Sequence, residues 1–152
     1  MTMEIHHQSL EEASTQLENE ARMLLPGVQA ILGFQLIAAF NQRFEQFSAG
    51  EQLLHFVAFL LLALTMGLLM APAAYHRQAE CRVVSAWFVK MASALLTIAM
   101  VPFIVGVGID TYLVGKMILK DTGSAVMAAG GVLLILVGLW FVLPRTARPG
   151  RR

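Results

Sequence analysis

The sequence has little charge and almost no cysteine. Only 14% of its 152 residues are charged, whereas soluble domains carry about 25%, so a soluble globular domain is disfavoured. The single cysteine, Cys81, excludes a disulfide within the chain and lacks the companion residues that a metal site requires. HExxH patterns, phosphate-binding glycine loops and nucleophile–base pairs are also missing. We therefore expect no metal, no cofactor and no enzymatic activity.

Long apolar runs are what the chain has instead. Hydrophobic residues make up 57% of it, and the mean hydropathy is +0.67. Residues 53–75 contain no charged side chain, and about 18 such residues usually mark a transmembrane helix. Three further apolar segments predict spans at about 26–44, 91–109 and 124–143. The predicted fold is an all-α integral membrane protein, a four-transmembrane-helix bundle in residues 26–144.

A short amphipathic helix is predicted in residues 1–25, before the first span. Ser9 and Glu12 have the spacing of a capping box, and leucines recur every seven residues after them. Pro26 then favours a break, because proline is well suited to the first position of a new helix. We expect this segment to lie near the lipid headgroups, with a short coiled coil between protomers as the alternative.

Small residues recur along two spans at spacings that let helix backbones approach closely. They are Ala63, Gly67 and Ala71 in the second span, and Ala92, Ala99 and Gly106 in the third. These positions predict close helix packing and favour a chain that associates with copies of itself.

A few polar side chains in or beside the spans are candidates for an ion pathway: Gln35, Asn41, Arg43, His55 and Asp110. An unpaired amide in hydrocarbon costs several kcal/mol, so Gln35 should find a partner on another helix or in another subunit. A structural hydrogen bond is the plainer role for it, and a polar pathway is the alternative. Asp110 is expected at the outer edge of the third span, and only a shift of that span would bury it.

The basic residues predict the orientation. Eight of the 11 lysines and arginines fall in the amino-terminal segment, the connection after the second span, and a basic tail at 145–152. By the positive-inside rule, both termini should be cytoplasmic. The tail has no interleaved aromatic residues, so binding to nucleic acid is disfavoured, whereas contact with the lipid bilayer is expected.

Several short motifs between about residues 17 and 144 resemble a family of small bacterial four-span membrane proteins with a domain of unknown function. They are Glu20-x-Arg22 followed by Pro26-Gly27-Val28-Gln29, then Phe40 with Arg43-Phe44, and Ala71-Pro72-Ala73-Ala74-Tyr75-His76-Arg77. The resemblance implies a four-helix inner-membrane protein, and some members carry the label sodium:proton antiporter. An antiporter needs an ionisable group within the membrane, and the predicted spans contain no carboxylate.

Two functions from different classes remain open. The first is a non-enzymatic, self-associating scaffold or modulator of membrane components, indicated by the small-residue spacings. The second is an oligomeric pathway for protons or sodium ions that uses the polar candidates. Flux through proteoliposomes distinguishes them.

Overall fold

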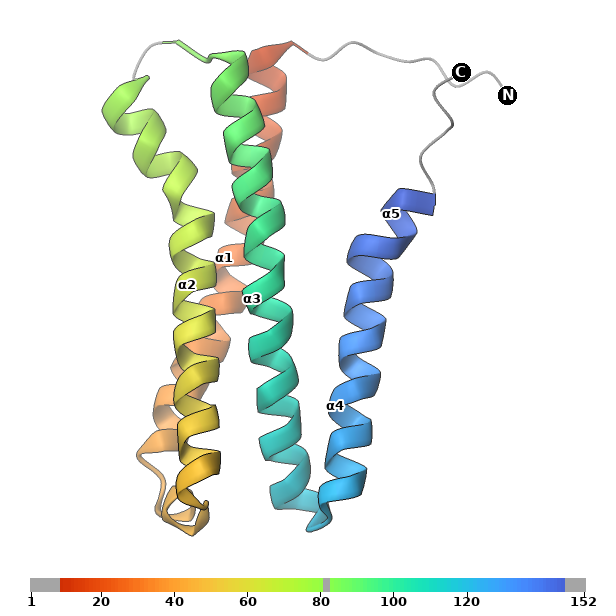
Figure 1. The fold of residues 1–152 in the computed structure, drawn as a ribbon. Coiled ribbons are helices and arrows are strands. Elements are labelled where there is room, and N and C mark those ends of the chain that lie inside the picture. Colours follow the sequence, from red (N-terminus) through yellow and green to blue (C-terminus); the bar gives the residue numbers. More distant parts are fainter. Residues whose placement is uncertain (1–8, 81–82, 147–152) are drawn as a thin grey trace.

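The computed structural model, which describes residues 9–80 and 83–146, contains four long helices that run up and down in sequence (Figure 1). They are α1 (Leu10–Ala39), α2 (Ala49–Ala79), α3 (Ala86–Leu119), and a fourth that starts as α4 (Thr122–Val137) and passes through a π-helical turn (Gly138–Val142) into α5 (Leu143–Thr146). A 3₁₀ turn, Gln42–Gln46, connects α1 to α2. All four are long and apolar enough to cross a membrane, which confirms the predicted fold class.

A capping side chain starts each long helix, at Ser9, Ser48, Ser85 and Asp121. The capping box predicted at the first of these is confirmed, because the Glu12 N–H donates to Ser9 Oγ (3.2 Å) and the Ser9 N–H donates to Glu12 Oε2 (3.0 Å). Such caps satisfy amide groups that the first turn of a helix leaves without partners.

The break predicted at Pro26 is wrong, because α1 continues through it as one helix of 30 residues. Proline inside a helix costs about 3 kcal/mol. Packing on both sides of the proline offsets this cost: Leu25 before it and Val28 after it contact the same core. The amphipathic segment and the first span therefore form a single helix rather than two.

The third helix is longer than predicted. It runs for 34 residues instead of ending at residue 109, so the expected connection at 110–123 is wrong and Asp110 lies inside the helix. The chain turns only at Lys120, which adopts a left-handed conformation (φ 56°), and at Asp121. The helix continues because two polar groups in this stretch, on Asp110 and Lys116, have partners on neighbouring helices.

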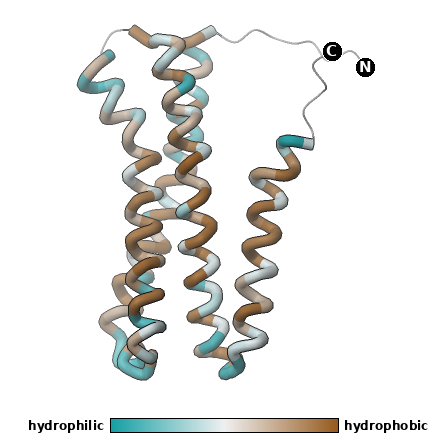
Figure 2. The backbone as a smooth tube through the Cα atoms, viewed as in Figure 1, coloured by the Kyte–Doolittle hydropathy of each residue, from teal (hydrophilic) through white to brown (hydrophobic). Residues whose placement is uncertain are grey.

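The core lies where α1, α2 and α3 meet, around Val28, Leu69, Leu96 and Ala99. The fourth helix packs on α3 and stands apart from α1 and α2 (Figure 1). Hydrophobic residues fill the middle of the helices, and hydrophilic ones gather at their ends (Figure 2). An apolar groove of about 480 Å³ separates α1 from the fourth helix, with Trp140 on one wall.

The two sets of small residues differ in their surroundings. In α3, Ala92, Ala99 and Gly106 are buried, and a β-carbon added at Gly106 would lie 3.2 Å from a side-chain carbon of Leu62 in α2. In α2, Ala63 and Gly67 are exposed, and the glycine has no neighbour within 4 Å of an added β-carbon. Ala71, the third residue of this set, is half-buried, and close helix packing at these three positions stays a prediction.

Two predicted features fall wholly or partly outside the described residues. Cys81 belongs to the connection between α2 and α3, and the tail at 145–152 is described only as far as Thr146.

The contact between α3 and α4 yields a prediction. A methyl group added at Gly108 would lie 2.7 Å from Leu133 Cδ2, whereas one added at Gly131 has nothing within 4 Å. Both alanine substitutions gain the same helix propensity. Gly108→Ala should therefore be less stable than Gly131→Ala by about 1–3 kcal/mol, the usual cost of overpacking. Unfolding of the detergent-solubilised protein, followed by circular dichroism, measures the difference, and equal stabilities would contradict the contact.

Candidate functional site

A buried hydrogen bond joins the first and third helices near one end of the bundle. Gln35 of α1 is 5% exposed, and its Nε2 donates to both carboxylate oxygens of Asp110 in α3, at 2.8 and 2.7 Å. This is the partner on another helix that the sequence predicted for Gln35. A hydrogen bond to a charged group contributes about 1.5–3 kcal/mol, so the pair ties the two helices together.

His55 of α2 completes this cluster. Its Nε2 lies 3.1 Å from the backbone carbonyl oxygen of Gln35, and the imidazole packs edge-on against the Phe44 ring, with centroids 5.1 Å apart. Because a carbonyl oxygen only accepts, this contact requires a proton on Nε2. The cluster therefore brings together one carboxylate, one amide and one imidazole from three helices.

The position of Asp110 in the third helix differs from the predicted one. Asp110 is expected just after a span that ends at residue 109, but α3 continues past it, so it lies nine residues before the end of the helix, which is about 14 Å along the helix axis. Gln35 lies four residues before the end of α1, or about 6 Å. A carboxylate thus lies within a candidate membrane span. Such residues are rare in spans and are usually functional.

The amide oxygen of Gln35 is also informative. Gln35 Oε1 is buried and has no hydrogen-bond partner among the described residues, although a buried acceptor normally has one. The two ends of a glutamine amide have nearly the same shape. Rotation of the amide by half a turn would direct Oε1 at Asp110, where it could accept a proton from a neutral carboxyl group. Gln35 can therefore bond both protonation states of Asp110.

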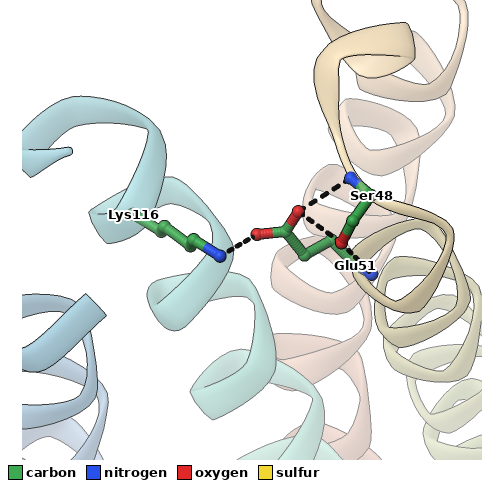
Figure 3. A network of polar contacts seen from close by, with 3 residues as sticks. All are labelled: Ser48, Glu51 and Lys116. Carbon is green, nitrogen blue, oxygen red and sulfur yellow. Dashed lines mark hydrogen bonds and ion pairs between the residues drawn. The ribbon is translucent and has the colours of Figure 1, made fainter. Parts of the chain in front are cut away.

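A second polar network lies closer to the same end of the bundle (Figure 3). Glu51, in the first turn of α2, is 9% exposed and lies 2.5 Å from the ammonium group of Lys116 in α3. Its other carboxylate oxygen accepts from the hydroxyl and the backbone N–H of Ser48, at 2.7 and 2.8 Å. Glu51 therefore caps its own helix and binds α3. It lies one helical turn before His55 on the same face of α2.

The remaining polar candidates lie outside these contacts. Asn41 starts the 3₁₀ turn, where its Oδ1 accepts from the backbone N–H of Arg43 at 3.0 Å, and both residues are exposed. Sequence reasoning missed Glu51 and Lys116 as a pair. The Ser48-x-x-Glu51 spacing indicates a capping box, but no sequence pattern indicates a partner 65 positions away.

Asp121 is an exposed carboxylate at the same end and serves as a comparison. It lies between α3 and α4, and hydrogen bonds from Ser124 lower the pKa of its carboxyl group. Within residues 9–80 and 83–146, no group of three or more His, Cys, Asp or Glu side chains is placed to hold a metal ion.

These features define a small multi-pass membrane protein with four candidate spans and a polar cluster inside them. The chain belongs to a family of unknown function, DUF6328, whose model matches residues 3–144. Neither the curated proteins nor the solved structures contain a match to it.

The ion pair between α2 and α3 can be tested by a double-mutant cycle. Glu51→Gln, Lys116→Gln and the double variant should show a favourable coupling free energy, because the two charged groups are in direct contact. Unfolding in detergent measures it. The control cycle combines Lys116→Gln with Glu12→Gln, which weakens the equivalent capping box in α1, and it should show no coupling. Equal coupling in both cycles would contradict the contact.

Proposed function

We propose that this protein binds and releases a proton at Asp110 inside the membrane, as part of an oligomeric ion-transport function. The observation that carries the proposal is the position of this carboxylate: it lies within α3 and is held by the buried amide of Gln35. Intramembrane carboxylates are the usual proton carriers of pumps and transporters. The sequence alone favoured a scaffold because it placed no carboxylate in a span, and that reason no longer holds.

The contacts favour a proton over a sodium ion as the bound species. Both oxygens of Asp110 are engaged by one amide nitrogen, and Gln35 Oε1 is shielded from solvent. A sodium ion needs several oxygen ligands at once, whereas a proton needs only the carboxylate and an acceptor. The Gln35 amide, rotated by half a turn, supplies that acceptor through its Oε1.

Access to the cluster comes from the end that holds Glu51 and Lys116. Toward the opposite end, the buried side chains of the described bundle are mostly apolar, and Thr65 and Ser14 are the polar exceptions. The apolar ones include Ala58, Leu62, Leu69, Leu96 and Ala99. A proton that crosses the membrane therefore needs a rearranged bundle or a second copy of the chain. This supports a homo-oligomer as the functional unit.

The proposal includes a location and an orientation. The bacterial inner membrane is what the resemblance to the four-span family implies. The positive-inside rule favours cytoplasmic termini, which puts the Asp110 cluster nearer the outer surface. The function is non-enzymatic, with protons and the lipid bilayer as its partners.

Flux measurements test the role of Asp110. In proteoliposomes with a pH gradient, the wild-type protein should dissipate the gradient, and Asp110→Asn should lower the rate to that of empty liposomes because asparagine cannot carry a proton. His55→Ala and Gln35→Leu should slow the flux, since they remove the partners of the site. An internal pH-sensitive dye follows the reaction, with sodium present or absent.

The matched controls are Asp121→Asn and Gln29→Leu, which alter exposed residues of the same types. Both should transport protons at the wild-type rate. Wild-type flux from Asp110→Asn, or no flux from the wild-type protein, would overturn the proposal. A strict requirement for sodium would replace a proton site with a sodium-coupled one.

The exposed small residues of α2 support a second function, self-association as a scaffold. Gly67 has open space where a β-carbon would project, and Ala63 lies one turn before it on the same exposed face. In lipid, such faces let two helices pack backbone to backbone.

A bulky residue on this face should weaken self-association. We expect Gly67→Leu to lower the dimer fraction in lipid bicelles, because the leucine side chain separates the helix backbones. Ala94→Leu alters an exposed small residue of α3 and should leave the fraction unchanged. Chemical cross-linking followed by electrophoresis measures both. Identical dimer fractions in Gly67→Leu and the wild-type protein would exclude this face as the interface.

A further inference from the structure

A second polar region lies at the opposite end of the bundle from Asp110. A pocket of about 450 Å³ opens between α1, α2 and α3, and its polar rim carries Arg22 of α1 with His76 and Arg77 of α2. His76 lies 21 residues after His55 on the same helix, or about 32 Å along its axis. The two regions are therefore separated by most of a membrane thickness.

The rim of this pocket is positively charged. It has two guanidinium groups and one carboxylate, that of Glu18, so a positive charge remains. Guanidinium groups bind phosphate through paired hydrogen bonds. His76 adds a ring whose Nδ1 is buried without a hydrogen-bond partner in the described chain, and its imidazole packs on Phe88 at 5.2 Å between centroids.

The deeper wall of the same pocket is apolar. Leu25 of α1, Leu69 of α2 and Leu96 of α3 line it. Leu69 lies eight residues before Arg77, which places it about 12 Å nearer the middle of the membrane. The pocket is therefore basic at its rim and apolar further in. A phospholipid has the matching arrangement, with a phosphate at one end and acyl chains at the other.

We propose that this pocket binds an anionic phospholipid from the leaflet in which α1 begins. Arg22 and Arg77 contact the headgroup phosphate, and the acyl chains lie along the leucine wall. Charge complementarity selects the headgroup, and the apolar wall distinguishes a lipid from a soluble phosphate. Basic pockets between transmembrane helices bind such headgroups in this way. This site is independent of proton binding at Asp110.

Lipid titration of the full chain tests the site. The detergent-solubilised protein is titrated with short-chain phosphatidylglycerol, phosphatidylcholine or inorganic phosphate, and native mass spectrometry counts bound lipids while the unfolding temperature is recorded. Phosphatidylglycerol should bind one molecule per chain tightly and raise the unfolding temperature. Phosphatidylcholine should bind more weakly by roughly tenfold or more, since it has no net charge, and inorganic phosphate should have no effect at the same concentrations.

Two kinds of variant locate the binding. Arg22→Gln with Arg77→Gln should weaken phosphatidylglycerol binding at least as much as the change of headgroup does. Ala73→Phe fills the pocket without removing a charge, because Ala73 lines it, and should also weaken binding. Arg145→Gln removes a cation on α5 outside the pocket and should bind like the wild-type protein. Circular dichroism confirms that each variant is folded.

Three results would overturn the proposal. Equal affinity for the two lipids removes the charge argument. Wild-type binding by both the double arginine variant and Ala73→Phe places the lipid elsewhere. Stabilisation by inorganic phosphate equal to that by phosphatidylglycerol identifies a phosphate site rather than a lipid site.

Discussion

An unsatisfied polar group costs several kcal/mol in hydrocarbon, and this constraint governs the whole structure. Three of the four long helices continue through an internal proline, at Pro26, Pro72 and Pro102, so that only one backbone hydrogen bond is lost at each. The same constraint explains the distribution of side chains. Polar groups gather at the helix ends (Figure 2). Further along the helices, Gln35 and Asp110 pair across helices, whereas hydroxyl groups such as that of Thr65 donate to a carbonyl of their own helix.

Two polar pairs join three of the helices to one another. Gln35–Asp110 joins α1 to α3, and Glu51–Lys116 joins α2 to α3. Both act near one end of the bundle, while the apolar core holds the three helices together further along. The fourth helix contributes to neither pair and contacts α3 through small residues such as Gly108 and Gly115. Among the described residues, polar pairs and an apolar core therefore join α1, α2 and α3, and the fourth helix contacts α3 through apolar packing.

Composition and apolar runs were sufficient to predict the fold class, because a membrane span needs only length and hydropathy. The capping box at Ser9 was also predictable, since its signal is local. Helix boundaries were not. The end of α3 depends on Asp110 and Lys116, whose charges suggest a loop until their partners on other helices are known. The helix break predicted at Pro26 is wrong for the same reason, because the packing that offsets the cost of the proline comes from residues distant in sequence.

In the candidate site, too, the sequence predicted the individual residues but not their arrangement. Gln35, His55 and Asp110 were each recognisable as unusual in an apolar chain, but their meeting on three helices was not, because it depends on how the helices pack. Their meeting gives Asp110 a hydrogen-bond partner in both of its protonation states.

A carboxylate with such a partner needs little reorganisation of its surroundings when it exchanges a proton. The Gln35 amide can meet this condition, because it donates through Nε2 and accepts through Oε1 when it rotates. A lysine such as Lys116 could not, because its ammonium group only donates. Asp110 lies nine residues before the end of α3 and Lys116 only three, so in the proposed site the proton is exchanged further inside the bundle than the fixed charge of the lysine.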